Sequence, residues 1–180
     1  MYAKSLAAFA ALLIVQSAFA SGLAPDNVSL EFGTGAKVQM LGLAVQSTWD
    51  RRWFESNGTY LGAFWDLSLA QWRGNAYRNV AGQHQDITVI GVTPTFRLQA
   101  SDRRGWYAEL GIGYHLLSTL YNNDDNRLST AFQFGDHLGA GYVFANGWEV
   151  AAKLQHFSNG GIKRPNSGVN FAVFKLARPF

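Results

Sequence analysis

The chain has no cysteine, few charged residues and no long hydrophobic run after its first 20 residues. The absence of cysteine excludes a disulfide scaffold, a thiolate metal site and a cysteine nucleophile. Charged residues make up 15% of the chain, against about 25% in typical soluble domains. This deficit argues against a disordered chain and against an ordinary, highly charged soluble surface. A transmembrane helix is also excluded beyond residue 20, because it needs about 18 or more consecutive apolar residues.

The N-terminal segment has the features of a secretory signal peptide. Lys4 precedes an apolar run over residues 6–15, and residues 18–20 form an A-x-A cleavage site. We therefore expect residues 1–20 to be removed and residues 21–180 to form a single exported domain. An uncleaved N-terminal anchor is the alternative. The net charge of the whole chain is only +3, which is too small and dispersed to indicate a nucleic-acid partner.

Glycine and aromatic residues are abundant, and they occur in segments where apolar residues alternate with polar or small ones. In the segment 106–116, the odd-numbered residues are polar or small, and they include two glycines, one glutamate and one histidine. The even-numbered residues, which share the other face of the strand, are uniformly apolar: Trp106, Ala108, Leu110, Ile112, Tyr114, Leu116. A long apolar face opposite isolated charges is typical of an outer-membrane barrel, which is apolar outside and polar inside.

Eight such segments predict an all-β fold, an eight-stranded antiparallel transmembrane barrel of the bacterial outer membrane. The even number and the lengths suit tilted strands of about 9–11 residues. Tryptophans near the strand ends resemble interfacial girdles. A secreted β-sandwich or lipocalin-like barrel remains the alternative, because alternation alone does not say which face contacts water. The expected strands cover residues 27–34, 37–48, 59–73, 84–100, 105–119, 131–144, 148–158 and 168–180.

The seventh predicted strand, residues 148–158, carries a polar pair on its apolar face. His156 and Ser158 follow Val150, Ala152 and Leu154 on the same parity. With both termini in the periplasm, this strand ends at the outer leaflet, so the pair faces lipid there. Imidazole beside a hydroxyl suits nucleophilic catalysis, since the imidazole takes the serine proton as the oxygen attacks a carbonyl. Ordinary polar residues above the hydrocarbon edge are the alternative.

Strand register suggests two neighbours for His156. Residues 145–147 form a short loop, and matching the faces across it sets Asp136 opposite His156. The same matching of faces between the seventh and eighth predicted strands sets Asn170 opposite His156. A carboxylate beside an imidazole fixes its tautomer and stabilises the imidazolium. The alternative for Asp136 is an interfacial carboxylate that binds water or a lipid-associated cation.

The loop after the polar pair is rich in hydrogen-bond donors. It contains consecutive glycines, Gly160 and Gly161, and the side-chain amides of Asn159 and Asn166. Such groups can stabilise the oxyanion of a tetrahedral intermediate.

From residue 156 to residue 168 the sequence reads H-F-S-N-G-G-I-K-R-P-N-S-G. This segment resembles the signature of the PagL family of outer-membrane lipid A 3-O-deacylases, in which H-x-S-N is followed by a short basic stretch and P-N-x-G. The resemblance includes residues 139–141 and 144–147 and covers essentially the whole mature chain. It implies an eight-stranded barrel that hydrolyses the ester at the 3 position of lipid A without a metal or other cofactor.

The resemblance also implies roles for individual residues. Ser158 resembles the family's nucleophile and His156 its general base. Asn159, Gly161 and Asn166 resemble its oxyanion region.

One residue departs from the family pattern. Where the family has a glutamate that orients the histidine, this chain has Asn170. An amide oxygen accepts a hydrogen bond from the histidine Nδ1–H but supplies no charge. Either Asp136 supplies that charge, or a His–Ser dyad is held by the amide alone, or the activity is weak. We favour the first, with Asp136 as an orienting carboxylate.

The expected partners are lipopolysaccharide, through its lipid A, and other outer-membrane lipids, and the exposed apolar wall makes a homodimer conceivable. Lys163 and Arg164 lie just after the polar pair and are candidates for binding lipid A phosphates; a solvated basic loop is the alternative. Two competing functions are an outer-membrane phospholipase or acyltransferase, and a non-catalytic structural barrel.

Overall fold

The computed structural model describes residues 24–180. Among these residues, no helix is long and apolar enough to cross a membrane. The predicted signal peptide, residues 1–20, lies outside the described residues.

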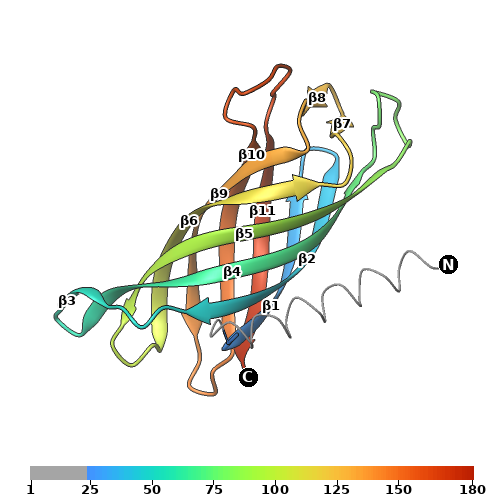
Figure 1. The fold of residues 1–180 in the computed structure, drawn as a ribbon. Helices are drawn as coiled ribbons and strands as arrows, with labels where there is room; N and C mark the ends of the chain where they lie inside the picture. The colour runs from blue at the N-terminus through green and yellow to red at the C-terminus, as the bar shows by residue number, and fades with distance from the viewer. Residues whose placement is uncertain (1–23) are drawn as a thin grey trace.

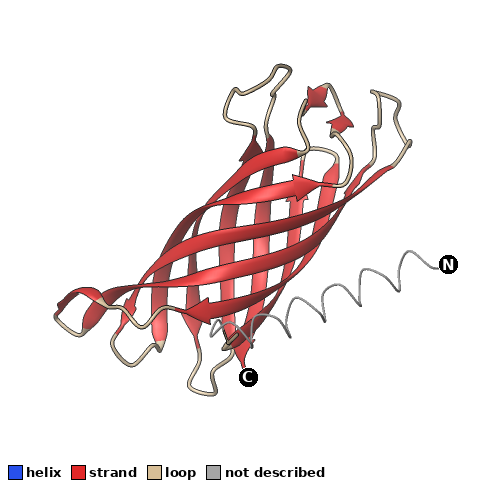
Figure 2. Cartoon of the chain, in the orientation of Figure 1, coloured by secondary structure: helices blue, strands red, loops and turns tan. Residues whose placement is uncertain are grey.

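Eight long strands form a closed antiparallel barrel, as the alternation predicts (Figures 1 and 2). Each strand pairs with the next along the chain, and the first pairs with the last, which closes the wall. The barrel strands are β1 (Asn27–Gly35), β2 (Val38–Thr48), β4 (Thr59–Gly74), β5 (Gln85–Ala100), β6 (Gly105–Leu117), β9 (Phe132–Val143), β10 (Glu149–Ser158) and β11 (Val169–Pro179).

Three short strands lie outside the wall. β3 (Trp53–Ser56) pairs with the start of β4 and extends that hairpin beyond the barrel (Figure 1). β7 (Asn122–Asn123) and β8 (Asn126–Arg127) pair with each other in the connection between β6 and β9. This connection and the loop 159–168 lie at one end of the barrel, while the C-terminus and β3 lie at the other (Figure 1).

The outward face of the wall is a broad apolar band, as an antiparallel barrel in lipid requires. Large hydrophobic side chains that would be buried in a soluble protein are mostly exposed here, Trp106 at 76% and Leu154 at 69% among them. Others with half or more of their surface exposed are Phe32, Leu41, Leu43, Leu110, Ile112, Tyr114, Leu116, Leu138 and Phe174.

The lumen near the C-terminal end holds a buried network of charges. The Arg97 guanidinium donates to carboxylate oxygens of Glu109 at 2.6 Å and of Glu149 at 2.8 Å. Lys175 Nζ lies 2.8 Å from Glu149, and the Tyr107 hydroxyl donates to the same carboxylate at 2.6 Å. Buried charges persist only when they are paired in this way, and the predicted polar lumen is confirmed.

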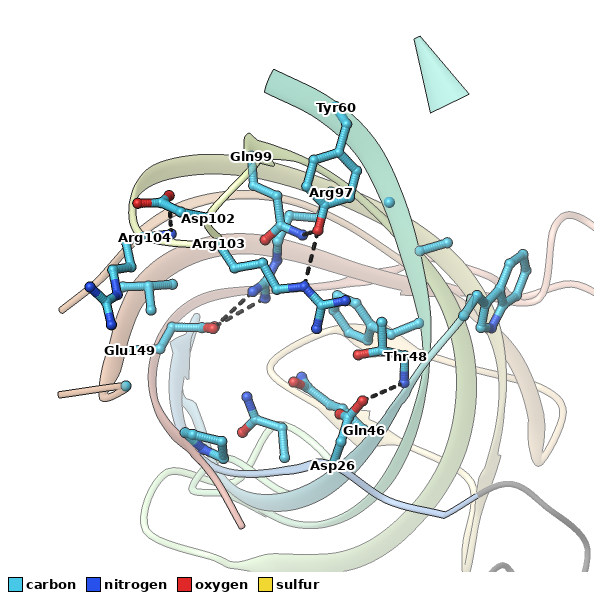
Figure 3. Close-up of a pocket in the computed structure, with 18 of the residues that line it drawn as sticks. Asp26, Gln46, Thr48, Tyr60, Arg97, Gln99, Asp102, Arg103, Arg104 and Glu149 are labelled. Carbon is cyan, nitrogen blue, oxygen red and sulfur yellow. Dashed lines mark hydrogen bonds and ion pairs between the residues drawn. The ribbon is translucent and has the colours of Figure 1, made fainter. Parts of the chain in front are cut away.

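Between this network and the C-terminal end, the lumen opens as a hollow of about 700 Å³ (Figure 3). Its wall includes Tyr60, whose hydroxyl accepts hydrogen bonds from Gln99 at 2.7 Å and from Arg103 at 3.2 Å. Towards the opposite end the lumen is instead filled by aromatic rings. Trp72 packs against Phe157 and Phe171, with ring centroids 4.7 and 5.0 Å away.

Candidate active site

His156 and Ser158 lie at the C-terminal end of strand β10, at the barrel end opposite the chain's C-terminus. Both share the outward parity of Leu154, while Phe157 between them points into the lumen and is buried. Because Phe157 is locked against Trp72, the outward direction of its two neighbours is fixed by packing on the other face of the strand.

The register sets His156 opposite Asp136 on β9 and opposite Asn170 on β11, as the sequence predicts. The two neighbours differ in their contact with the imidazole. His156 Nδ1 lies 2.7 Å from Asn170 Oδ1. No ion pair within 4.0 Å joins His156 to Asp136 in the part of the chain that the structure describes. The imidazole is therefore held by the amide and not by the carboxylate.

Gly168 supports the other side of the imidazole. It has a φ of +74°, and a Cβ at this position would lie 2.6 Å from His156 Cε1. Such a separation is well inside van der Waals contact, so only glycine allows both this backbone conformation and the ring position. This role of Gly168 was not predicted, because residue spacing alone gives no signal of the contact with His156.

The loop after Ser158 is organised around a fully buried asparagine. The Asn159 backbone N–H donates to Asn166 Oδ1 at 2.9 Å, and the Gly161 N–H donates to Asn159 Oδ1 at 3.0 Å. These two N–H groups are thus used within the loop. Across residues 24–180, no hydrogen-bond partner is found for the Gly160 N–H or for Asn166 Nδ2, so both are among the loop's free donors.

Ser129, in the connection between β6 and β9, fastens this loop from outside. Its hydroxyl donates to the Lys163 carbonyl at 2.8 Å and accepts from Asn159 Nδ2 at 3.3 Å. Asn159 Nδ2 also donates to the Lys163 carbonyl, at 2.7 Å. Ser129 could not be predicted from the sequence, because a serine 29 residues before Ser158 in a polar connection carries no local pattern.

Lys163 and Arg164 are exposed on this loop, and neither forms an ion pair among the described residues. Their charges are available to an anionic ligand at the outer rim of the wall. Residues 24–180 contain no cluster of three or more His, Asp or Glu side chains that could bind a metal ion.

The wall beside His156 is hollowed on its lipid-facing side. The hollow has a volume of about 450 Å³ and is bordered by the polar groups of Asp136, His156 and Asn170. Leu138, Leu154 and Ala172 continue it towards the membrane interior. It lies at the opposite end of the barrel from the lumen mouth shown in Figure 3. The hollow offers the imidazole of His156 to a substrate that remains in the membrane, and Ser158, which is not among the lining residues, is the next outward residue along β10.

Comparison with known proteins identifies the family. A family model described as lipid A 3-O-deacylase (PagL) matches residues 39–179. The chain is 31% identical over 174 residues to lipid A deacylase PagL of Pseudomonas aeruginosa, a match covering 95% of this chain and 96% of that protein. It is 32% identical over 156 residues to lipid A deacylase PagL of Bordetella bronchiseptica, covering 86% and 83% of the two chains. The crystal structure of the outer membrane enzyme PagL superposes with a TM-score of 0.74 at 25% identity, covering 86% of this chain and 99% of that one. The chain belongs to the PagL family of lipid A 3-O-deacylases.

Proposed function

We propose that this chain hydrolyses the 3-position acyl ester of lipid A in the outer leaflet, with Ser158 as nucleophile and His156 as general base. The observation that carries the proposal is the 2.7 Å contact between His156 Nδ1 and Asn170 Oδ1. The amide oxygen accepts a hydrogen bond from the Nδ1–H, which keeps the proton on Nδ1 and leaves Nε2 unprotonated and able to act as a base.

The reaction follows the logic of serine esterases. His156 Nε2 takes the proton of the Ser158 hydroxyl as its oxygen attacks the ester carbonyl carbon. The tetrahedral oxyanion is stabilised by the free donors of the loop, the Gly160 N–H and Asn166 Nδ2, while Asn159 and Gly161 hold the loop in shape. The intermediate then expels the sugar hydroxyl, which takes its proton from His156. Water, activated by the same imidazole, releases the fatty acid.

The place of these residues suits a lipid substrate. Ser158 and His156 face outward at the end of the wall, so an acyl ester reaches them without leaving the leaflet. Lys163 and Arg164 lie on the loop above, where charge-assisted hydrogen bonds to the lipid A phosphates would hold the sugar at the rim. Asp136 lies beside His156, but no ion pair or hydrogen bond joins the two among residues 24–180, so we assign the orientation of the imidazole to Asn170.

The proposal is tested by mass spectrometry of lipid A from a lipid A-bearing bacterium that expresses the chain. The expected result is loss of one 3-hydroxyacyl chain from the 3 position, abolished in Ser158→Ala. Heat-modifiable mobility on gels verifies that both proteins are folded barrels. Unchanged lipid A in the presence of folded wild-type barrel would overturn the proposal and favour a phospholipid substrate or a non-catalytic barrel.

A further inference from the structure

The hollow in the lumen near the C-terminal end lies at the opposite end of the barrel from His156 (Figure 3). It has a volume of about 700 Å³, and the ion pair between Arg97 and Glu149 lies at its inner end. Outside this pair the hollow is lined by four arginines and three aspartates, which gives it an excess of positive charge. A concave site with such an excess attracts anions.

Arg103 has a guanidinium that is mostly unused within the protein. Its Nε donates to the Tyr60 hydroxyl at 3.2 Å, and within residues 24–180 no acceptor is found for its two terminal nitrogens. Figure 3 shows the side chain extending from the turn between β5 and β6 over the mouth of the lumen. The terminal N–H groups form a planar fork that suits the oxygens of a carboxylate or phosphate, and they are available to such a ligand.

The backbone of Arg103 adopts a conformation that disfavours arginine. Its φ is +60°, in the left-handed region where glycine and asparagine are favoured. Its N–H donates to the Ala100 carbonyl at 2.9 Å, which closes the turn. Because glycine or asparagine would suit this turn better, the presence of arginine indicates a use for its side chain other than stability.

Tyr60 supplies a second donor beside Arg103. It is buried, and its hydroxyl oxygen accepts hydrogen bonds from Gln99 Nε2 at 2.7 Å and from Arg103 Nε. No acceptor for the hydroxyl hydrogen itself is found in the described part of the chain. The Arg52 guanidinium lies over the same ring, with its Cζ 4.3 Å from the ring centroid. One phenolic O–H and two guanidinium groups thus gather on one wall of the hollow.

The aspartates of the hollow do not neutralise these arginines. The carboxylate of Asp26 accepts the Thr48 backbone N–H at 3.0 Å, and that of Asp102 accepts the Arg104 backbone N–H at 3.0 Å. Among residues 24–180, no ion pair within 4.0 Å joins an arginine of the hollow to any of its three aspartates. A phosphate monoester has three terminal oxygens and a carboxylate has two, so the phosphate matches this set of donors better.

We propose that this hollow binds a small soluble phosphate monoester, with the Arg103 guanidinium and the Tyr60 O–H as donors to the phosphate oxygens. The hollow lies inside the ring of strands, so a phospholipid head group would reach it only by drawing its acyl chains out of the hydrocarbon region. The ligand is therefore a soluble one. With the active site in the outer leaflet, the mouth opens to the periplasm, and the inference rests on the proposed function for this orientation alone.

Isothermal titration calorimetry of the folded barrel in detergent micelles tests the site, with glycerol 3-phosphate as the probe. We expect saturable binding of one molecule per chain with a Kd of about 1 mM or below, which two or three charge-assisted hydrogen bonds provide. Arg103→Asn removes the guanidinium and suits the positive φ. We therefore expect the affinity to fall about 10–100-fold while stability in urea is kept or raised. The matched control is Arg178→Asn, near the same barrel end but outside the hollow, which is expected to bind as wild type does.

Tyr60→Phe removes the O–H donor but keeps the ring beneath Arg52, and it is expected to weaken binding about tenfold. Unchanged affinity in this variant contradicts the placement of the phosphate beside Tyr60. The proposal is wrong if folded wild type shows no saturable binding, or if Arg103→Asn and Arg178→Asn weaken it equally. Tighter binding of succinate, a dicarboxylate, would assign the hollow to a carboxylate ligand and also overturn it. Because the assay contains no lipid A, none of these outcomes bears on the deacylase function.

Discussion

His156 is held between an amide and a glycine, and the amide decides which nitrogen carries its proton. A carboxylate at the position of Asn170 accepts only, whereas a side-chain amide carries an acceptor and a donor on the same group. In the structure the oxygen faces His156 Nδ1 at 2.7 Å, which gives the tautomer that general-base catalysis needs. This arrangement orients the imidazole but supplies no charge to the imidazolium that the proposed mechanism requires.

Asn170→Glu is therefore expected to raise kcat, because a carboxylate both enforces the Nδ1–H tautomer and stabilises the imidazolium. The reverse exchange in a serine protease costs about 10⁴-fold in turnover; since the amide here already presents its oxygen, we expect a gain of about tenfold or more. Steady-state hydrolysis of a glucosamine ester measures it. Asn170→Ala, which removes the acceptor, is expected to fall below wild type. Equal rates in all three proteins would show that Asn170 does not orient the imidazole.

Gly168→Ala is expected to displace the His156 ring, because the new Cβ would lie 2.6 Å from Cε1. We expect kcat to fall by about 100-fold, as misplacement of a catalytic group by about 1 Å can cost. Gly82→Ala controls for backbone strain, since its φ is also positive, +80°, but its Cβ would meet no atom within 4 Å. Both variants should lose similar stability in urea, and only the first should lose activity. Similar activity losses would contradict a specific role for the ring contact.

At the level of single residues, the sequence predicted the neighbours of His156 but not the contacts among them. Register arithmetic placed Asp136 and Asn170 beside it correctly. It could not say which side chain turns towards the imidazole, because that depends on rotamers and on the space left by Gly168. The role of Asp136 as an orienting carboxylate was the favoured interpretation, and the contact lies with Asn170 instead.

At the scale of elements, the loop that carries the proposed oxyanion donors is held in place by a second segment. The loop 159–168 is joined to the β6–β9 connection through Ser129 and through a β-bridge between Leu128 and Asn166. The Ser167 N–H also donates to the Arg127 carbonyl at 3.1 Å. The shape of the loop 159–168 thus depends on a segment for which no catalytic role is proposed.

Ser129→Ala removes one donor and one acceptor from this junction and is expected to loosen the loop without altering substrate contacts. A net hydrogen bond contributes about 1 kcal/mol, so we expect kcat to fall about fivefold with little change in KM. Ser129→Thr, which keeps the hydroxyl, is expected to recover most of the activity. A change confined to KM would indicate that Ser129 contacts substrate and does not position the loop.

The barrel strands could be predicted because the residues on one face of each strand, every second residue, are mostly apolar and face lipid. The predicted strands agree with the eight barrel strands to within a few residues, and the largest error is at the end of β6, where the prediction ran to residue 119 and the strand ends at Leu117. The short strands β3, β7 and β8 were missed. They lie beyond the membrane, where water satisfies both faces and alternation no longer marks a strand.

At the scale of the whole molecule, the two ends of the lumen are stabilised by different forces. Beneath the active site the lumen is filled by Trp72, Phe157 and Phe171, which support β10 from inside. At the far end it is filled by the ion network around Arg97, which borders the open hollow (Figure 3). The proposed active site and the ion network thus lie in separate parts of one barrel, and we expect stability and catalysis to be separable.

Arg97→Leu tests this separation. It leaves Glu109 and Glu149 buried with Lys175 as the remaining cation within 4.0 Å among residues 24–180, and breaking a buried ion pair from one side typically costs about 3–5 kcal/mol. We expect a loss of that size in the free energy of unfolding, measured by urea titration in lipid vesicles. Lys37→Leu, which breaks the exposed Lys37–Asp124 pair of 2.6 Å, should cost at most about 1 kcal/mol. Because the network lies at the end opposite His156, folded Arg97→Leu protein should keep the wild-type kcat. A fall in kcat that accompanies the loss of stability would show that the ion network affects the geometry of the active site at the opposite end. The two ends of the barrel would then be coupled.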